Sequence, residues 1–243
     1  MIKKSIIVFC FSAVSLLAEK EVGLSLGAGT VLKSSPYKNG KNKLFVLPHI
    51  DGKYENFYIR GLEAGYRLYT DESKDFKLFT KGDLGGYKES DADILSGMDE
   101  RKNGISGGIG AAYKTPYGKL GISVSRDVSG AGDGYFGELE YSKNFNIGSG
   151  VFVGYVGIDY MDSKSSNYYY GIKVSEAAKE RAAYEPNGAF NGYIGGKYIH
   201  FFDKNIFLFS NIKLTRFDDS IAKSDIVDKK YNALAAIAVG YKF

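Results

Sequence analysis

The chain has 243 residues, a length that fits a single domain, and it carries 32 basic against 28 acidic residues for a net charge of +4. So small an excess of positive charge argues against a nucleic-acid-binding protein. The longest apolar run is shorter than the roughly 20 residues that a membrane-spanning helix needs, which excludes a helical inner-membrane protein. The chain is rich in Tyr (20), Phe (16) and Gly (31) but has only four Pro and one Cys, which favours many strands.

The first 18 residues have the pattern of a secretory signal peptide. Lys3 and Lys4 form a positive start, and an apolar run, 5–18, ends at the small residue Ala18. A lipoprotein signal with Cys10 as the acylated residue is the alternative, but bulky Phe9 precedes Cys10 and the apolar run continues past it. We therefore expect residues 1–18 to be removed on export and residues 19–243 to form one domain without cysteine.

The domain shows alternation of apolar and polar residues from end to end, as strands do. Most of the predicted strands have 11 to 14 residues, longer than the roughly 5–6 of a soluble protein and long enough to cross a bilayer obliquely. The predicted strands are 21–33, 43–55, 57–70, 76–88, 104–115, 119–130, 135–145, 150–162, 189–202, 206–217 and 230–243.

The two faces of the terminal strands differ in character. In the last strand, one face carries Tyr231, Ile237, Val239 and Tyr241, while the other carries mostly small residues. An apolar outer face with aromatic residues at the strand ends is typical of an all-β, antiparallel transmembrane β-barrel, and a β-sandwich is the alternative. In the first strand the inward residues are small, which predicts room in the lumen; they are Gly23, Ser25, Gly27 and Gly29.

Bacterial single-chain barrels have an even number of strands, whereas the pattern gives eleven. The ambiguity lies in residues 43–70, where only Asn56 separates two predicted strands and Gly61 could bend one. We expect about 12 strands, with 10 as the alternative. Counting back from the C-terminus places the loops 89–103, 131–134, 163–188 and 218–229 outside the cell and the turns 115–118, 146–150 and 203–205 on the periplasmic side.

Residues that could carry catalysis are few. His49 and His200 lie in predicted strands, and neither belongs to a metal-ligand pattern. No serine lies in a G-x-S-x-G motif, and the acidic loop 90–104 lacks the spacing of a calcium-binding loop. The sequence therefore predicts a protein that is not an enzyme and has no cofactor and no metal.

The predicted external loop at 163–188 contains the one segment with helical character. Ser175 can cap a helix, Glu176 suits its first turn, alanines follow, and Pro186 would end it. A helix of two or three turns is unstable alone, so we expect it to pack on the barrel or on a partner.

This loop, "YYYGIKVSEAAKERAAYEPNG", resembles the MipA/OmpV family, the MltA-interacting protein family of outer-membrane barrels. Three other segments resemble the same family in the same order: "SPYKNG" with "LPHIDGKYENFYIRG", "LSGMDERKNGISGGIGAAY" and "LTRFDDSIAKSDIVDKKYNALAAIAVGYKF". The matching loops supply the candidate interaction residues, which are Gly97, Met98, Arg101, Tyr169, Tyr170, Gly171, Arg181, Tyr184 and Pro186.

The resemblance implies an outer-membrane protein that acts as a scaffold for murein synthesis and hydrolysis machinery. Its expected partners are outer-membrane lipids and periplasmic murein-processing enzymes or envelope lipoproteins. A small channel or transport barrel that affects permeability is the alternative, with the 163–188 loop as a gate or lid. The resemblance implies no catalytic residues, and the sequence leaves the oligomeric state open.

Overall fold

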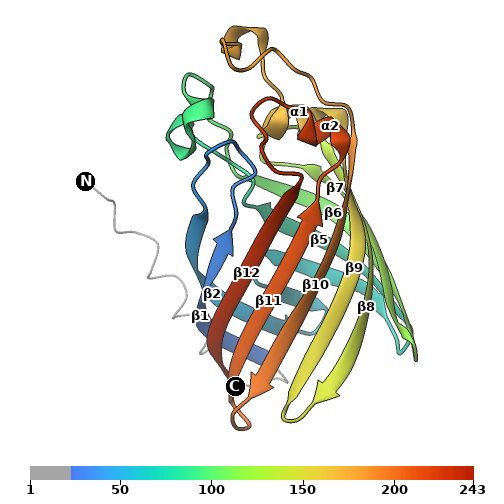
Figure 1. Cartoon of the computed structure of the whole chain (residues 1–243). Helices are drawn as coiled ribbons and strands as arrows, with labels where there is room; N and C mark the ends of the chain where they lie inside the picture. Colours follow the sequence, from blue (N-terminus) through green and yellow to red (C-terminus); the bar gives the residue numbers. More distant parts are fainter. Residues whose placement is uncertain (1–22) are drawn as a thin grey trace.

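The computed structural model describes residues 23–243, which form a closed barrel of 12 antiparallel strands, each paired with its neighbours in sequence, and β1 paired with β12 (Figure 1). The prediction of an all-β barrel with about 12 strands is confirmed. The strands are β1 Gly23–Lys33, β2 Lys43–Tyr54, β3 Phe57–Arg60, β4 Glu63–Thr70, β5 Lys74–Asp83, β6 Gly104–Thr115, β7 Gly118–Asp127, β8 Tyr135–Ile147, β9 Gly150–Met161, β10 Ala189–Phe201, β11 Ile206–Arg216 and β12 Tyr231–Lys242.

The predicted signal peptide, residues 1–18, lies outside the described residues, so it stays a prediction. Within residues 23–243, the helices are all too short or too polar to cross a bilayer.

The twelfth strand comes from the segment 57–70, which the sequence pattern assigned to one strand. The structure divides it into β3 and β4 at a tight turn. Gly61 adopts φ +57° in this turn, a left-handed conformation that glycine reaches without strain. The glycine that the sequence marked as a bend is therefore the point where the chain reverses.

The two ends of the barrel differ. At one end the strands are joined by short turns, and the C-terminus lies there. At the other end lie the longer connections, which include helices α1 Ser163–Tyr170 and α2 Asp219–Ala222 and the 3₁₀ turns η1 Glu89–Asp91, η2 Asp93–Leu95 and η3 Val174–Glu176. Long outer loops and short periplasmic turns are usual in such barrels, and the assignment of loops to two ends agrees with the prediction.

The strand faces follow the predicted alternation. On β12, Ile237, Val239 and Tyr241 are exposed on the outer surface, while Ala238 is buried. An apolar outer surface would be unstable in water and suits the hydrocarbon of a bilayer.

The small inward residues of β1 differ in the room that they leave, because a Cβ atom built at Gly23 would have no atom within 4 Å, whereas Gly27 and Gly29 are closely approached by β12. A Cβ atom built at Gly27 would lie 2.2 Å from the carbonyl oxygen of Val239, and one at Gly29 would lie 2.5 Å from the Cβ of Ala238. These glycines allow β12 to approach β1 closely, so the space that their missing side chains would fill is already occupied.

Other strand glycines accommodate aromatic rings from neighbouring strands. A Cβ at Gly195 of β10 would lie 2.3 Å from the Tyr155 ring of β9, and one at Gly240 would lie 2.4 Å from the Phe207 ring. Such pairs fill the lumen wall with rings that lie over glycine backbone, in the manner of cross-strand pairs that stabilise sheets. The high content of Tyr and Phe and the high content of Gly are thus related, because the rings pack over the glycines.

The predicted short helix in the long external loop exists, but its predicted position is wrong. The helix is α1, Ser163–Tyr170, whose first turn is capped by the Asp162 side chain accepting a hydrogen bond from the Ser165 amide. Ser175 makes no cap, and the alanines after Glu176 are not helical. Tertiary contacts of Glu176 and Arg181, described below, override the helix propensity of the alanines.

Candidate functional site: the loop cap and the lumen

Four outer connections pack together over one end of the barrel and form what we call the loop cap, residues 34–42, 84–103, 162–188 and 217–230. Together with the adjacent strand residue Ala189, they enclose a hydrophobic core that lies above the lumen. Its buried members are Tyr37, Tyr87, Ala92, Leu95, Met98, Ile172, Ala189, Phe217, Ile221, Ile226 and Val227. Burial of this apolar surface is the main source of the cap's stability.

A buried ion pair joins two of the cap's loops. Arg101 Nη2 donates to Glu176 Oε2 at 2.8 Å, and the two side chains are only 4% and 3% exposed. Burial disfavours the charge of Glu176, but hydrogen bonds from Arg101 and from the Lys173 and Asp99 amides hold its carboxyl pKa below the ordinary value. Arg101 also donates to the carbonyls of Asp99 and Tyr168, so each of its three guanidinium nitrogens has a hydrogen-bond acceptor.

Arg181 makes a second polar link between the same loops. Its guanidinium donates to the carbonyl oxygens of Glu176, Ile94 and Ser96, and the side chain is buried. An arginine that donates to three carbonyls holds the loop backbones in a fixed arrangement. Gly97 has φ +76° beside it, and its amide donates to the Glu89 carboxylate.

The end of α1 is the part of the cap where Tyr169 and Tyr170 face the lumen cavity. Tyr37 donates from its hydroxyl to the carbonyl of Tyr169, and Ser224 donates to the carbonyl of Tyr170. The helix ends at Gly171, where a larger residue would not fit because a Cβ would lie 1.8 Å from the Asn167 Oδ1. Burial raises the pKa of both Tyr169 and Tyr170, so their hydroxyls remain protonated at neutral pH.

The structure therefore brings together most of the residues that the sequence selected. Met98 and Pro186 are buried in the cap, and Tyr184 donates from its hydroxyl to the Ser220 carbonyl. Only Gly97 of the nine is largely exposed. These residues hold the cap together, and whether they also contact a partner stays a prediction.

Beneath the cap, the lumen contains a cavity of about 330 Å³. Pro36, Tyr169, Tyr170 and Phe217 of the cap line it from above. Its strand residues carry opposite charges in equal numbers, which are Lys33, Lys77, Lys81 and Lys213 with Glu63, Asp83, Glu138 and Asp159.

The charged side chains reach across the lumen. Lys81 of β5 lies 4.0 Å from Glu138 of β8, although two strands separate β5 and β8 along the wall. Tyr193 donates to Glu138 at 2.7 Å, and Lys213 lies 3.6 Å above the Tyr193 ring. These side chains make the lumen narrower. Because positive and negative charges are present in equal numbers, the lumen has no electrostatic potential of a single sign.

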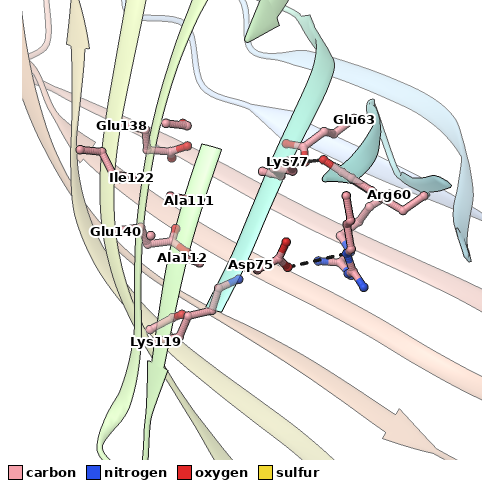
Figure 2. Close-up of a pocket in the computed structure, with 15 residues that line it drawn as sticks. Arg60, Glu63, Asp75, Lys77, Ala111, Ala112, Lys119, Ile122, Glu138 and Glu140 are labelled. Atoms are coloured by element: carbon pink, nitrogen blue, oxygen red, sulfur yellow. Dashed lines mark hydrogen bonds and ion pairs between the residues drawn. The ribbon is translucent and has the colours of Figure 1, made fainter. Parts of the chain in front are cut away.

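A second cavity, of about 150 Å³, continues from the first and shares Glu63, Lys77 and Glu138 with it. In Figure 2, Glu63 and Lys77 are joined on one wall, at 2.5 Å, while Glu138 and Glu140 lie on the opposite wall. Because the two cavities share lining residues, the polar interior extends along much of the lumen.

The two histidines lie apart from one another. His49 packs against Phe207 and Phe209, while His200 approaches Ser149 in the turn between β8 and β9 and Tyr198 of its own strand. Among residues 23–243 there is no cluster of three His, Cys, Asp or Glu side chains that could hold a metal ion.

Sequence reasoning missed the lumen charges and the role of Glu176. The signal for the lumen was present, because Lys77 and Lys81 in one strand and Glu138 and Glu140 in another alternate with outward apolar residues. Applying the period of two to charged residues would have placed them inside. The partner of Glu176 lies 75 residues away and leaves no local pattern.

Comparisons with known proteins find similar sequences over most of the chain. Residues 26–243 match the family model described as MltA-interacting protein MipA. The chain is 25% identical over 230 residues to the MltA-interacting protein of Escherichia coli K12, covering 93% of each chain. It is 27% identical over 192 residues to the outer membrane protein OmpV of Vibrio cholerae, covering 79% of this chain and 75% of that protein. Among solved structures, an outer membrane channel from Pseudomonas putida F1 aligns with a TM-score of 0.42 and 12% identity over 92% of this chain and 97% of that one.

Proposed function

The chain belongs to the MltA-interacting protein MipA family of outer-membrane barrels, and from this premise we propose that it is a non-enzymatic interaction protein for murein-processing machinery. The E. coli relative is named for an interaction with MltA, and it aligns over 93% of both chains. The partner that we propose for this chain is of the same kind, a periplasmic murein-processing enzyme or an envelope lipoprotein. The outer-membrane lipids that surround the barrel are its other partners.

The loop cap is the observation that carries this proposal. A barrel whose outer loops form a packed core with a buried ion pair, above a lumen narrowed by charged side chains, is poorly suited to act as an open diffusion pore. The short turns at the opposite end lie on the side where murein enzymes work. The contact surface that we propose is therefore the periplasmic rim, with turns such as those at Ser149 and Lys204.

Site-specific photocrosslinking in cells tests the proposal. A photoreactive residue at Lys204, on the periplasmic rim, should capture a murein-processing enzyme or a lipoprotein. The matched control is Val174, which is highly exposed on the cap and should capture neither. Recovery of no envelope protein from rim positions, with the barrel correctly folded, would exclude the interaction role.

A gated channel is the second candidate, and the polar lumen favours it. The two cavities share lining residues, and their charges offer a path for a small polar solute. In this role the cap would be the gate. Planar-bilayer recordings should show conductance once residues 172–186 are deleted. If neither the intact protein nor this deletion conducts, the channel candidate fails.

A further inference from the structure

The barrel wall is incomplete beside the upper part of β2. β3 has only four residues and pairs with Asp51–Tyr54 of β2, so residues 43–50 of β2 have a strand partner only in β1. From Ile50 to Lys43 the strand continues for seven residues, or roughly 23 Å at about 3.3 Å per residue. We call this gap in the strand ladder the wall notch, bordered by residues 43–48, the turn 61–62 and residues 82–85.

Backbone groups of β2 point into the wall notch. The Ile50 carbonyl accepts a hydrogen bond from the Gly61 amide at the floor of the notch. The backbone N–H and C=O groups of successive residues in a strand point to opposite neighbouring strands. The backbone groups of Leu44, Val46 and Pro48 therefore point in the same direction as those of Ile50, into the notch. Pro48 has no N–H, as suits an unpaired edge. Backbone groups without a hydrogen-bond partner in hydrocarbon cost free energy. We therefore expect the notch to hold a molecule that has polar groups as well as an apolar chain.

The inner side of the notch carries two lysines, Lys33 and Lys43, with the carboxylates of Asp83 and Asp91 nearby. Lys33 Nζ donates to the Leu84 carbonyl at 3.0 Å, and Lys43 Nζ donates to the Gly86 carbonyl at 2.8 Å. Lys43 also pairs with Asp91, whereas Lys33 has no carboxylate within ion-pair distance among the described residues. Lys33, Gly82, Asp83 and Gly85 also line the lumen cavity. The cavity therefore extends to the border of the notch.

The outer side of the notch is apolar. Val46 is 76% exposed, Leu44 64% and Leu62 47%. The cavity behind also has apolar walls, including Phe79, Phe136, Met161 and Leu234. Apolar side chains thus form the outer border of the notch, and the Lys33 ammonium lies on its inner side, beside a cavity of a size that holds small molecules.

We propose that the wall notch is a lateral binding site for a single-chain anionic amphiphile from the surrounding membrane. The carboxylate or phosphate head would lie on the Lys33 ammonium, and the acyl chain would extend into the lumen cavity towards Phe79. An anionic head satisfies the lysine that lacks a carboxylate, with a charge-assisted hydrogen bond. The inference does not depend on either function proposed above.

The free edge of β2 is poorly suited to pair with a second copy of the chain. Pairing of two β2 edges would need N–H donors along the whole edge, and Pro48 removes one of them.

Tryptophan fluorescence in lipid nanodiscs tests the proposal, because the chain contains no Trp. A Phe79→Trp variant places one reporter in the cavity, and Ile237→Trp places one on the lipid-facing surface. Dibromostearic acid, a single-chain anionic quencher, should quench both reporters. A dibrominated phosphatidylcholine, with two chains and no net charge, should quench only the reporter at 237. Leu234→Trp is a second cavity reporter if Phe79→Trp does not fold.

Head recognition is tested by adding Lys33→Met, which keeps the apolar stem but removes the ammonium. The dibromostearate concentration for half-quenching in the cavity should rise about tenfold, as loss of one charge-assisted hydrogen bond predicts. Cavity reporters that dibromostearate does not quench, or an unchanged half-quenching concentration in Lys33→Met, would overturn the proposal. Efficient disulfide-linked dimers of Val46→Cys would also overturn it, because they would show that a second copy covers the notch.

Discussion

Arg101 and Glu176 form a 2.8 Å ion pair between two outer loops that are 75 residues apart in sequence, and both side chains are almost fully buried. The Glu176 carboxylate also accepts hydrogen bonds from the amides of Asp99 and Lys173. The pair thus fixes the 84–103 loop against the 162–188 loop. We expect this link, together with the apolar core, to make the loop cap behave as one packed unit.

Removing one member of the pair should open the cap and leave the barrel folded. Arg101→Ala leaves the Glu176 charge buried without a partner, and such a loss typically costs about 3–5 kcal/mol. Limited proteolysis should cut the 84–103 and 162–188 loops faster in this variant, while the barrel keeps its heat-modifiable mobility on gels.

The matched control is Lys173→Ala, which removes the exposed pair of Lys173 with Asp99. Exposed pairs contribute about 0–1 kcal/mol, so its cleavage should resemble that of the wild type. Equal cleavage rates for Arg101→Ala and the wild type would show that the buried pair does not hold the cap.

The cap should loosen in acid. The pKa of Glu176 lies below its ordinary value of 4.5 because, against the effect of burial, hydrogen bonds from Arg101 and two amides favour the carboxylate. A carboxyl with a depressed folded pKa stabilises the fold above its unfolded pKa, and this contribution is lost as pH falls through the folded value. The loss should therefore occur below about pH 4.5.

A Phe217→Trp reporter in the cap core can follow this change through its emission maximum. The emission should shift to longer wavelength as pH falls below 4.5, because water enters the cap core and contacts the Trp side chain. Adding Glu176→Gln should remove most of this pH dependence, since the side chain can no longer titrate. If the Glu176→Gln variant shows the same emission shift as the protein with Glu176, the transition belongs to other groups, such as Asp91 and Asp218, whose pKa values are also lowered.

Glycine in β10 should be essential at one position and replaceable at another. A Cβ at Gly195 would meet the Tyr155 ring at 2.3 Å, whereas one at Gly192 would have no atom within 4 Å. Gly195→Ala should destabilise the barrel by about 1–3 kcal/mol, as overpacking does, and Gly192→Ala should leave it nearly unchanged. Urea unfolding midpoints measured side by side will separate the two, and equal midpoints would contradict the ring-over-glycine packing.

The barrel could be predicted from the sequence because its determinants are local. Alternation along each strand assigns Val239 to the outer face and Ala238 to the inner face, and it needs no knowledge of neighbours. Gly61 was visible as a bend, although only the pairing of β3 with β4 shows that the chain reverses there.

The cap could not be predicted in the same way, because its determinants are distant in sequence. The alanines after Ser175 favour a helix, yet the pairing of Glu176 with Arg101 and of Arg181 with the Ile94 and Ser96 carbonyls holds them in another conformation. Family-like segments nevertheless selected Arg101, Arg181 and Tyr184, which the structure places in one cap.

The central claim is that the four outer loops form one packed cap over the lumen, and amide hydrogen exchange of the folded protein tests it most directly. The amides of Arg101 and Tyr184 are bonded to the carbonyls of Tyr87 and Ile172 inside the cap. They should exchange far more slowly than an unstructured peptide, and Arg101→Ala should accelerate both together. Exchange of these amides at the rate of an unstructured chain in the wild-type protein would contradict the claim.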